Sequence, residues 1–111
     1  MIDEQEFRKH ADVALDRLNR ALIDAGDDYG FETDFNSGAL TIEIDGPRTR
    51  FVVSPNAPVR QIWVSARVKS FKLDWDPGRA EFVLPGDGRS LRELIAGVVG
   101  EQLDEDVKLS N

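Results

Sequence analysis

Carboxylates are the side chains most able to do chemistry in this chain, and they gather near its start. The first 34 of its 111 residues include ten Asp or Glu residues and only four Lys or Arg residues, whereas the rest of the chain is almost balanced, with eleven acids and ten bases. Carboxylates on an open helix face, with water completing the coordination, bind hard cations weakly and exchangeably. A solvated acidic surface that keeps the protein soluble is the other interpretation of this pattern.

The segment QIWVS, residues 61–65, contains a second group of side chains with a possible use. Successive residues of a strand point to opposite faces, so Ile62 and Val64 share one face of any strand formed here. If that aliphatic face is buried, Trp63 is a large exposed ring flanked by polar groups, which is typical of contact with a partner. The opposite orientation, with Trp63 in the core, stays open because tryptophan is usually at least partly buried.

Composition argues against most kinds of active site. The chain has no cysteine, which excludes disulfides, thiolate metal sites and cysteine nucleophiles and leads us to expect a cytoplasmic location. Its single histidine, His10, is expected on the charged side of the first helix. No glycine-rich phosphate loop, G-x-S-x-G or H-E-x-x-H motif is present. We therefore expect a binding and regulatory protein rather than an enzyme.

Charge and hydropathy also limit the partners. The formal net charge of -7 disfavours nucleic acid, because phosphate binding requires clustered Lys and Arg. The longest apolar stretches are far shorter than the roughly 18 residues needed to cross a bilayer, and the acidic start of the chain does not look like a secretory leader. We expect neither nucleic acid nor a membrane as a partner.

A helix and a run of strands must position the carboxylates and Trp63. Apolar residues recur at steps of three and four from about Asp3 to Ala25, which predicts an amphipathic helix that ends at Gly26. Between residues 31 and 84, short segments rich in β-branched and aromatic residues predict six strands in an antiparallel meander. The predicted buried stripe of the helix is Phe7, Ala11, Ala14, Leu15, Leu18 and Leu22.

A second helix closes the predicted fold. Ser90 and Glu93 have the spacing of a capping box, which marks its first turn. The fold class is therefore α+β, a two-layer α-β sandwich in which the N- and C-terminal helices pack on one face of an antiparallel sheet of about six strands, all in one domain spanning residues 1–111. The predicted buried stripe of the second helix is Leu91, Leu94, Ile95, Val98 and Leu103.

This architecture favours an exposed Trp63. A sheet covered by helices on one side has one dry face and one wet face. Residues 39–44 and 70–75 both alternate apolar and polar side chains, so their polar face is the open one. By the same alternation, Ile62 and Val64 go beneath the helices, and Trp63 lies on the open face.

The order of the elements and three short motifs resemble the frataxin family in its bacterial form. The motifs are P-x-x-Q-I-W-V-S at residues 58–65, the pair D-W at residues 74–75, and G-x-S-L at residues 88–91 before an apolar helix. The similarity runs from about Asp3 to Leu103. It implies a protein that binds iron through surface carboxylates, docks on a cysteine desulfurase and its iron–sulfur scaffold protein, and regulates iron–sulfur cluster assembly, with at most weak, incidental ferroxidase activity.

The resemblance also implies where iron, as Fe²⁺ or Fe³⁺, would be weakly and reversibly bound. The chain departs from the family near the end of the first helix, where Asn19, Arg20, Ile23 and Gly26 occupy positions that are often acidic in bacterial frataxins. A solvated helix face without metal therefore stays open as the alternative. The carboxylates that match or flank the acidic ridge of the family are Asp12, Asp16, Asp24, Asp27, Asp28, Glu32 and Asp34.

On the sheet, the resemblance implies a partner-binding surface that approaches the scaffold protein. Its residues are Gln61, Trp63, Ser65 and Lys72. A lone solvated pair of Lys72 and Asp74 is the alternative for that part of the surface.

One other class of protein shares the size, the acidity and the mixed helix and strand content. It is a small acidic α/β secretion-type chaperone, which dimerises and binds a cationic partner chain. Such a chaperone usually has a further helix between its strands, and residues 31–84 show no helical period. The frataxin interpretation instead predicts a monomer in the absence of iron.

Overall fold

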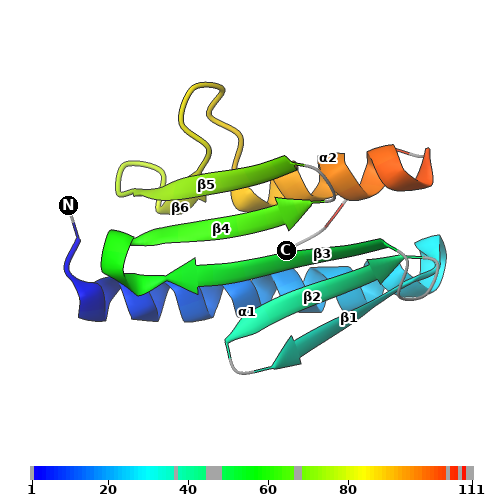
Figure 1. The fold of residues 1–111 in the computed structure, drawn as a ribbon, viewed down its shortest axis with the longest axis horizontal. Coiled ribbons are helices and arrows are strands. Elements are labelled where there is room, and N and C mark those ends of the chain that lie inside the picture. The colour runs from blue at the N-terminus through cyan, green and yellow to red at the C-terminus, as the bar shows by residue number, and fades with distance from the viewer. Residues whose placement is uncertain are drawn as a thin grey trace.

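An antiparallel sheet with two helices on one face makes up the computed structural model (Figure 1). The structure describes residues 2–36, 38–44, 49–66, 69–104, 106, 107 and 109, and only the backbone of residues 27 and 28. The six strands lie in the sheet in their chain order, which confirms the predicted meander. They are β1 (Phe31–Asn36), β2 (Ala39–Ile44), β3 (Thr49–Asn56), β4 (Gln61–Ala66), β5 (Lys69–Asp76) and β6 (Glu81–Val83).

The first helix is longer than its apolar stripe predicts. Helix α1 spans Glu4–Tyr29 and begins at Asp3, whose Oδ1 accepts a hydrogen bond from the Glu6 N–H at 2.8 Å. It ends at Gly30, which has a φ of 78°, the left-handed conformation that glycine adopts without strain. The prediction that Gly26 ends the helix is wrong, because a glycine inside a helix costs only about 1 kcal/mol and the helix continues through it.

The glycine at position 26 is needed for packing and not for ending the helix. A Cβ atom added at Gly26 would lie 2.8 Å from the backbone carbonyl oxygen of Phe31, closer than such atoms approach in folded proteins. The missing side chain therefore lets the start of β1 pack directly against the last turns of α1.

The second helix begins where its capping box predicts. Helix α2 spans Leu91–Leu103, and the Ser90 Oγ accepts from the Glu93 N–H at 3.2 Å. In return, the Ser90 N–H donates to Glu93 Oε1 at 3.0 Å, and this bond lowers the pKa of the Glu93 carboxyl below its ordinary value of 4.5. The predicted stripe needs two corrections, because Val99 is buried and Val98 only half-buried, and because Leu103 is also only half-buried.

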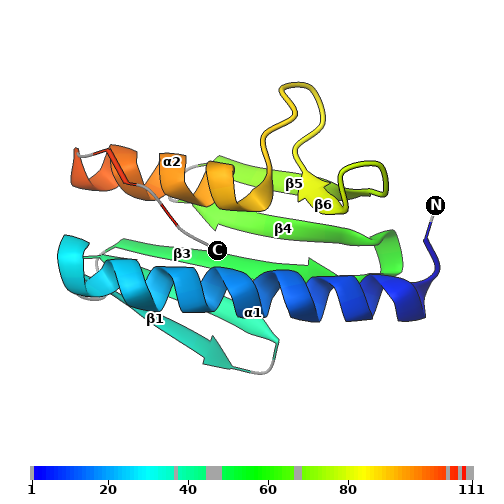
Figure 2. The ribbon, with the colours of Figure 1, turned by 180° about the vertical axis from the view of Figure 1, so that it is seen from behind.

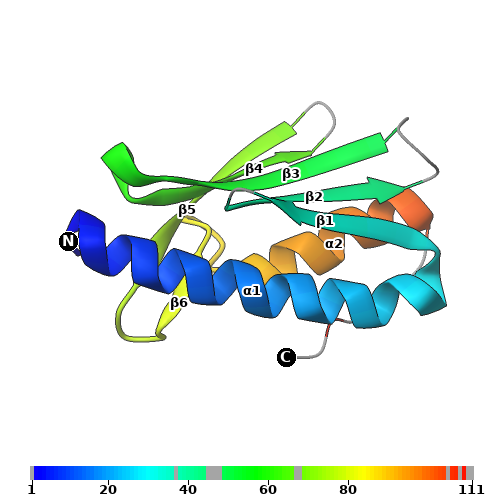
Figure 3. The same cartoon turned by 90° about the horizontal axis from the view of Figure 1, so that it is seen from below.

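The two helices form one layer and the strands the other. Figure 2 shows α1 and α2 side by side, running in the same direction, and Figure 3 shows both beneath the same face of the sheet. In the part of the chain that the structure describes, no helix combines the length and the apolar character needed to cross a bilayer. The largest fully buried side chains fill the space between the layers: Phe7, Leu15, Leu22, Leu40, Ile42, Phe51, Val53, Ile62, Leu73, Phe82, Leu94 and Ile95.

The strand region contains no long helix of its own. In the described residues between 31 and 83, the only helical segment is the 3-10 helix η2 (Ala57–Val59). This agrees with the absence of a helical period in the sequence. The described strand region therefore lacks the extra helix that a secretion-type chaperone usually has.

Candidate functional site

Strand β4 places Trp63 on the open face of the sheet. The Trp63 side chain is 38% exposed, whereas Ile62 and Val64 are 0% and 1% exposed beneath the helices. Gln61 is half-buried and Ser65 is exposed, on the same face as Trp63. The predicted orientation of the strand is therefore confirmed, and the alternative with Trp63 in the core is wrong.

The exposed indole is held in place by two polar neighbours, one of which is fixed by a third. Its Nε1–H donates to Gln61 Oε1 at 3.0 Å, and Gln61 Nε2 donates to Asp74 Oδ1 at 3.0 Å. The ammonium nitrogen of Lys72 lies 4.9 Å from the centre of the Trp63 ring, within the range of a cation–π contact. We call Gln61, Trp63, Lys72 and Asp74 the tryptophan cluster.

The pairing of β4 with β5 brings the tryptophan cluster together. In this antiparallel pair, Trp63 lies opposite Lys72 and Gln61 lies opposite Asp74. Sequence reasoning treated Asp74 only as a possible solvated partner of Lys72 and missed its bond to Gln61. Neither segment alone carries a signal for this bond, because it depends on the register between the two strands.

The carboxylates of α1 are dispersed along its surface. Asp12 and Asp24 are exposed, and Asp16 is half-buried. The side chain of Asp16 pairs with Arg20, whose Nε lies 3.1 Å from Asp16 Oδ2. An exposed pair of this kind, four residues apart on a helix, contributes only a few tenths of a kcal/mol.

The carboxylates of β1 face a different environment, on the open side of the sheet. Glu32 and Asp34 are both exposed. Glu32 lies directly opposite Glu43 of β2, and Glu43 Oε2 lies 3.7 Å from an Arg50 guanidinium nitrogen. Sequence reasoning did not include Glu43, although its outward place in the alternating segment 39–44 was visible.

The structure does not assemble these carboxylates into a metal-binding cluster. Among the described residues there is no group of three or more His, Asp or Glu side chains placed to hold a metal ion. The predicted ligands Asp27 and Asp28 lie outside this test, because their side chains are not among those described. Carboxylates that lie singly or in pairs leave most of a coordination shell to water, so the described carboxylates alone would hold a cation weakly.

Comparison with known proteins gives a consistent result. A family model for the frataxin-like domain matches residues 1–105. The iron-sulfur cluster assembly protein CyaY of Azotobacter vinelandii is 28% identical over 96 residues, which cover 85% of this chain and 86% of that protein. The protein of the same name from Dechloromonas aromatica is 31% identical over 108 residues, 97% of this chain and 99% of that protein.

A solved structure supports the fold independently. The frataxin from Psychromonas ingrahamii matches with a TM-score of 0.83 and covers 99% of this chain and 100% of its own. Its sequence is only 18% identical, so this match shows the shared fold alone.

Proposed function

The chain belongs to the frataxin-like family, and we propose that it works in iron–sulfur cluster assembly by docking on a cysteine desulfurase and its scaffold protein. The assignment to iron–sulfur cluster assembly is supported by the relatives in Azotobacter and Dechloromonas, both of which are named iron-sulfur cluster assembly proteins. We infer a binding and regulatory role for residues 1–111 as one domain, and any oxidation of Fe²⁺ is a consequence of oxygen reaching weakly bound metal.

The tryptophan cluster is the observation that carries the docking proposal. Aromatic side chains at the centre of an interface usually dominate its free energy of binding. Trp63 is already held by Gln61 and Lys72, so little side-chain freedom is lost when a partner covers it. Ser65 lies two residues further along the same face and extends the proposed docking surface.

The acidic side of the molecule has a different part in the proposal. Its exposed carboxylates, Asp12, Asp24, Glu32 and Asp34, create a negative field that attracts a basic surface on the desulfurase. Complementary charge of this kind acts mainly on the rate of encounter, so binding should slow as the salt concentration rises. The same carboxylates, with Asp16, Asp27 and Asp28, would carry iron as cargo in weak and exchangeable sites.

Truncation of the tryptophan tests the docking surface. Trp63→Ala should weaken binding to the scaffold protein, or to its complex with the desulfurase, by about 2 kcal/mol or more, roughly 30-fold. The matched control is Ile23→Ala, which removes another exposed apolar side chain, 55% exposed on α1. We expect the control to bind within about twofold of the parent in calorimetric titration. Equal affinity of Trp63→Ala and the parent would refute the proposed docking surface.

A metal titration tests the cargo proposal separately. Anaerobic addition of Fe²⁺, followed through backbone amide NMR, should perturb residues 12–34, and salt should weaken the effect. Shifts centred on the acids near the end of the chain, Glu101, Asp104 and Asp106, would instead show that iron binds elsewhere.

A further inference from the structure

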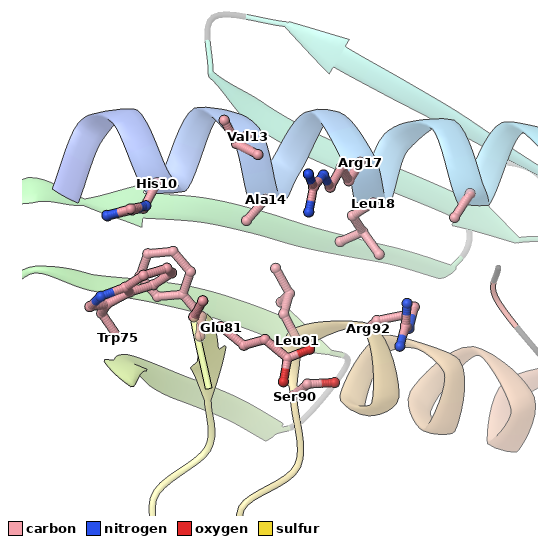
Figure 4. Close-up of a pocket in the computed structure, with 13 residues that line it drawn as sticks. His10, Val13, Ala14, Arg17, Leu18, Trp75, Glu81, Ser90, Leu91 and Arg92 are labelled. Atoms are coloured by element: carbon pink, nitrogen blue, oxygen red, sulfur yellow. The ribbon is translucent and has the colours of Figure 1, made fainter. Parts of the chain in front are cut away.

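The helix layer contains a groove that the docking and iron proposals do not use. It lies between α1, β6 and the start of α2 and encloses about 270 Å³ (Figure 4). Its lining is mostly carbon, from Val13, Ala14, Leu18 and Ala21 of α1 and Leu91 of α2. A cavity of this size accommodates one ring or a short branched chain, and it is too small for a helix or an extended peptide.

A pair of stacked rings closes one end of the groove. The imidazole of His10 lies parallel to the indole of Trp75, with 3.9 Å between ring centres and 14° between ring planes. Trp75 in turn packs edge-on against the buried ring of Phe82, with 5.1 Å between centres. The expectation that His10 lies on the charged side of α1 is therefore wrong, because its ring covers an aromatic surface at the edge of the core.

Two arginines lie toward the other end. Figure 4 shows Arg17 of α1 and Arg92 of α2 on opposite sides of the groove, away from Trp75. Within the described residues no ion pair to either arginine is found, although the charge of Arg92 also acts on the neighbouring Glu93 carboxylate, which lies 3.8 Å from Arg79. The start of α2 adds the positive end of a helix dipole on the same side.

The one carboxylate in the lining is paired with an arginine outside the lining. Glu81 Oε2 lies 3.1 Å from a guanidinium nitrogen of Arg79, the same arginine that lies 3.8 Å from Glu93. The groove therefore combines an apolar body with two arginines that form no ion pair within the described part of the chain, although the net charge of the whole chain is -7. This local reversal of sign is complementary to an anion that carries an apolar group.

We propose that this groove binds a small carboxylic acid with an aromatic ring or a short branched chain. The apolar part lies between Leu18 and Leu91 and reaches toward the ring of Trp75. The carboxylate lies at the end with Arg17 and Arg92, because guanidinium groups bind carboxylates through paired hydrogen bonds. The groove is on the helix side of the sheet, and Trp63 is on the other, so this inference stands apart from the docking proposal.

The first test uses 3-phenylpropionate as the probe. We expect a dissociation constant of about 0.1–1 mM, as befits a ligand of roughly eleven heavy atoms. Amide NMR shifts should appear at Ala14, Leu18 and Leu91 and be absent at Trp63. In a Trp63→Phe background, the fluorescence of Trp75 should change with the same midpoint. No shift at these residues with about 10 mM probe would overturn the proposal.

Three further compounds separate the charge of the probe from its apolar body. The neutral 3-phenylpropanamide should bind at least about tenfold more weakly, and the cation phenethylamine should not bind the groove. Inorganic phosphate should leave the groove amides unshifted. Equal binding of the amide, or equal shifts with phosphate, would show that carboxylate and ring are not recognised together and would refute the inference.

The second test removes the two cations. The double variant Arg17→Gln, Arg92→Gln should weaken the probe about tenfold or more. Arg20→Gln is the matched control, because Arg20 is an exposed arginine of the same helix that pairs with Asp16 outside the groove. It should change the affinity by less than about twofold. If the control and the double variant lower the affinity for the probe equally, the effect comes from the overall charge of the protein, and the proposed role of Arg17 and Arg92 is wrong. If the probe fails while an acidic apolar peptide binds, the groove is a protein-docking site and the small-acid proposal is wrong.

Discussion

The tryptophan cluster and the carboxylates of α1 and β1 are both polar surfaces, but the fold arranges their side chains differently. In the tryptophan cluster, neighbouring strands place each polar group within reach of the next, and the indole, amide and carboxylate form one connected chain of hydrogen bonds. The carboxylates are spread along a helix and an edge strand, and Asp16 is paired with Arg20, as Glu43 of the neighbouring strand β2 is with Arg50. The pairing of β4 with β5 therefore orders a contact surface, whereas the carboxylates of α1 and β1 stay mostly solvated.

The largest expected effect separates the two faces of β4. Ile62→Ala removes a fully buried side chain and should lower the free energy of unfolding by about 2–5 kcal/mol. Trp63→Ala removes an exposed anchor and should cost about 1 kcal/mol. Urea denaturation of both variants measures the difference. A larger loss for Trp63→Ala would mean that the ring belongs to the core and not to a docking surface.

The next effect concerns Ile23 and Gly26, two positions on α1 that are often acidic in bacterial frataxins. Gly26→Asp forces a Cβ atom toward the carbonyl oxygen of Phe31 and should destabilise the protein by about 1–3 kcal/mol. Ile23→Asp adds the same charge at a site that is 55% exposed and should change stability by about 0.5 kcal/mol or less. Thermal unfolding measures both. Parent-like stability of Gly26→Asp would show that β1 can shift away from α1 at little cost.

A smaller effect is expected within the tryptophan cluster. Gln61→Ala removes the hydrogen-bond partner of both Trp63 and Asp74 and should cost about 1 kcal/mol. The indole N–H resonance of Trp63 should also move toward the position of a solvated tryptophan. Ser65→Ala, on the same face of the same strand, is the control and should leave this resonance in place. An unchanged indole resonance in Gln61→Ala would mean that Gln61 does not orient the ring.

The smallest effect contrasts the solvated carboxylates with one that hydrogen bonds hold in place. The pKa of Glu93 lies below its ordinary value of 4.5, so its contribution to stability is present above that pH and is lost as the pH falls through the lowered pKa. Glu93→Gln keeps an acceptor for the Ser90 N–H but has no charge to titrate. Its stability should therefore fall less than that of the parent between about pH 5 and pH 3, as measured by denaturation at each pH. Identical pH profiles would contradict this assignment.

Local patterns in the sequence determined much of the fold. The apolar stripe of α1, the alternation in the strands and the capping box of Ser90 each depend on residues a few positions apart, and the structure confirms all three except that Ala14 of the stripe is only half-buried. The exposure of Trp63 followed from the same alternation. These features are readable because a helix and a strand have fixed periods of 3.6 and 2 residues.

Only the tertiary structure decided which distant residues meet. The stacking of His10 on Trp75, the close approach of Phe31 to Gly26, and the pairing of Gln61 with Asp74 join residues on different elements. No periodicity within a segment encodes these contacts, because they depend on strand register and on how the two layers pack. For the same reason the groove between the helices could not be predicted from the sequence, since its walls come from segments more than 50 residues apart.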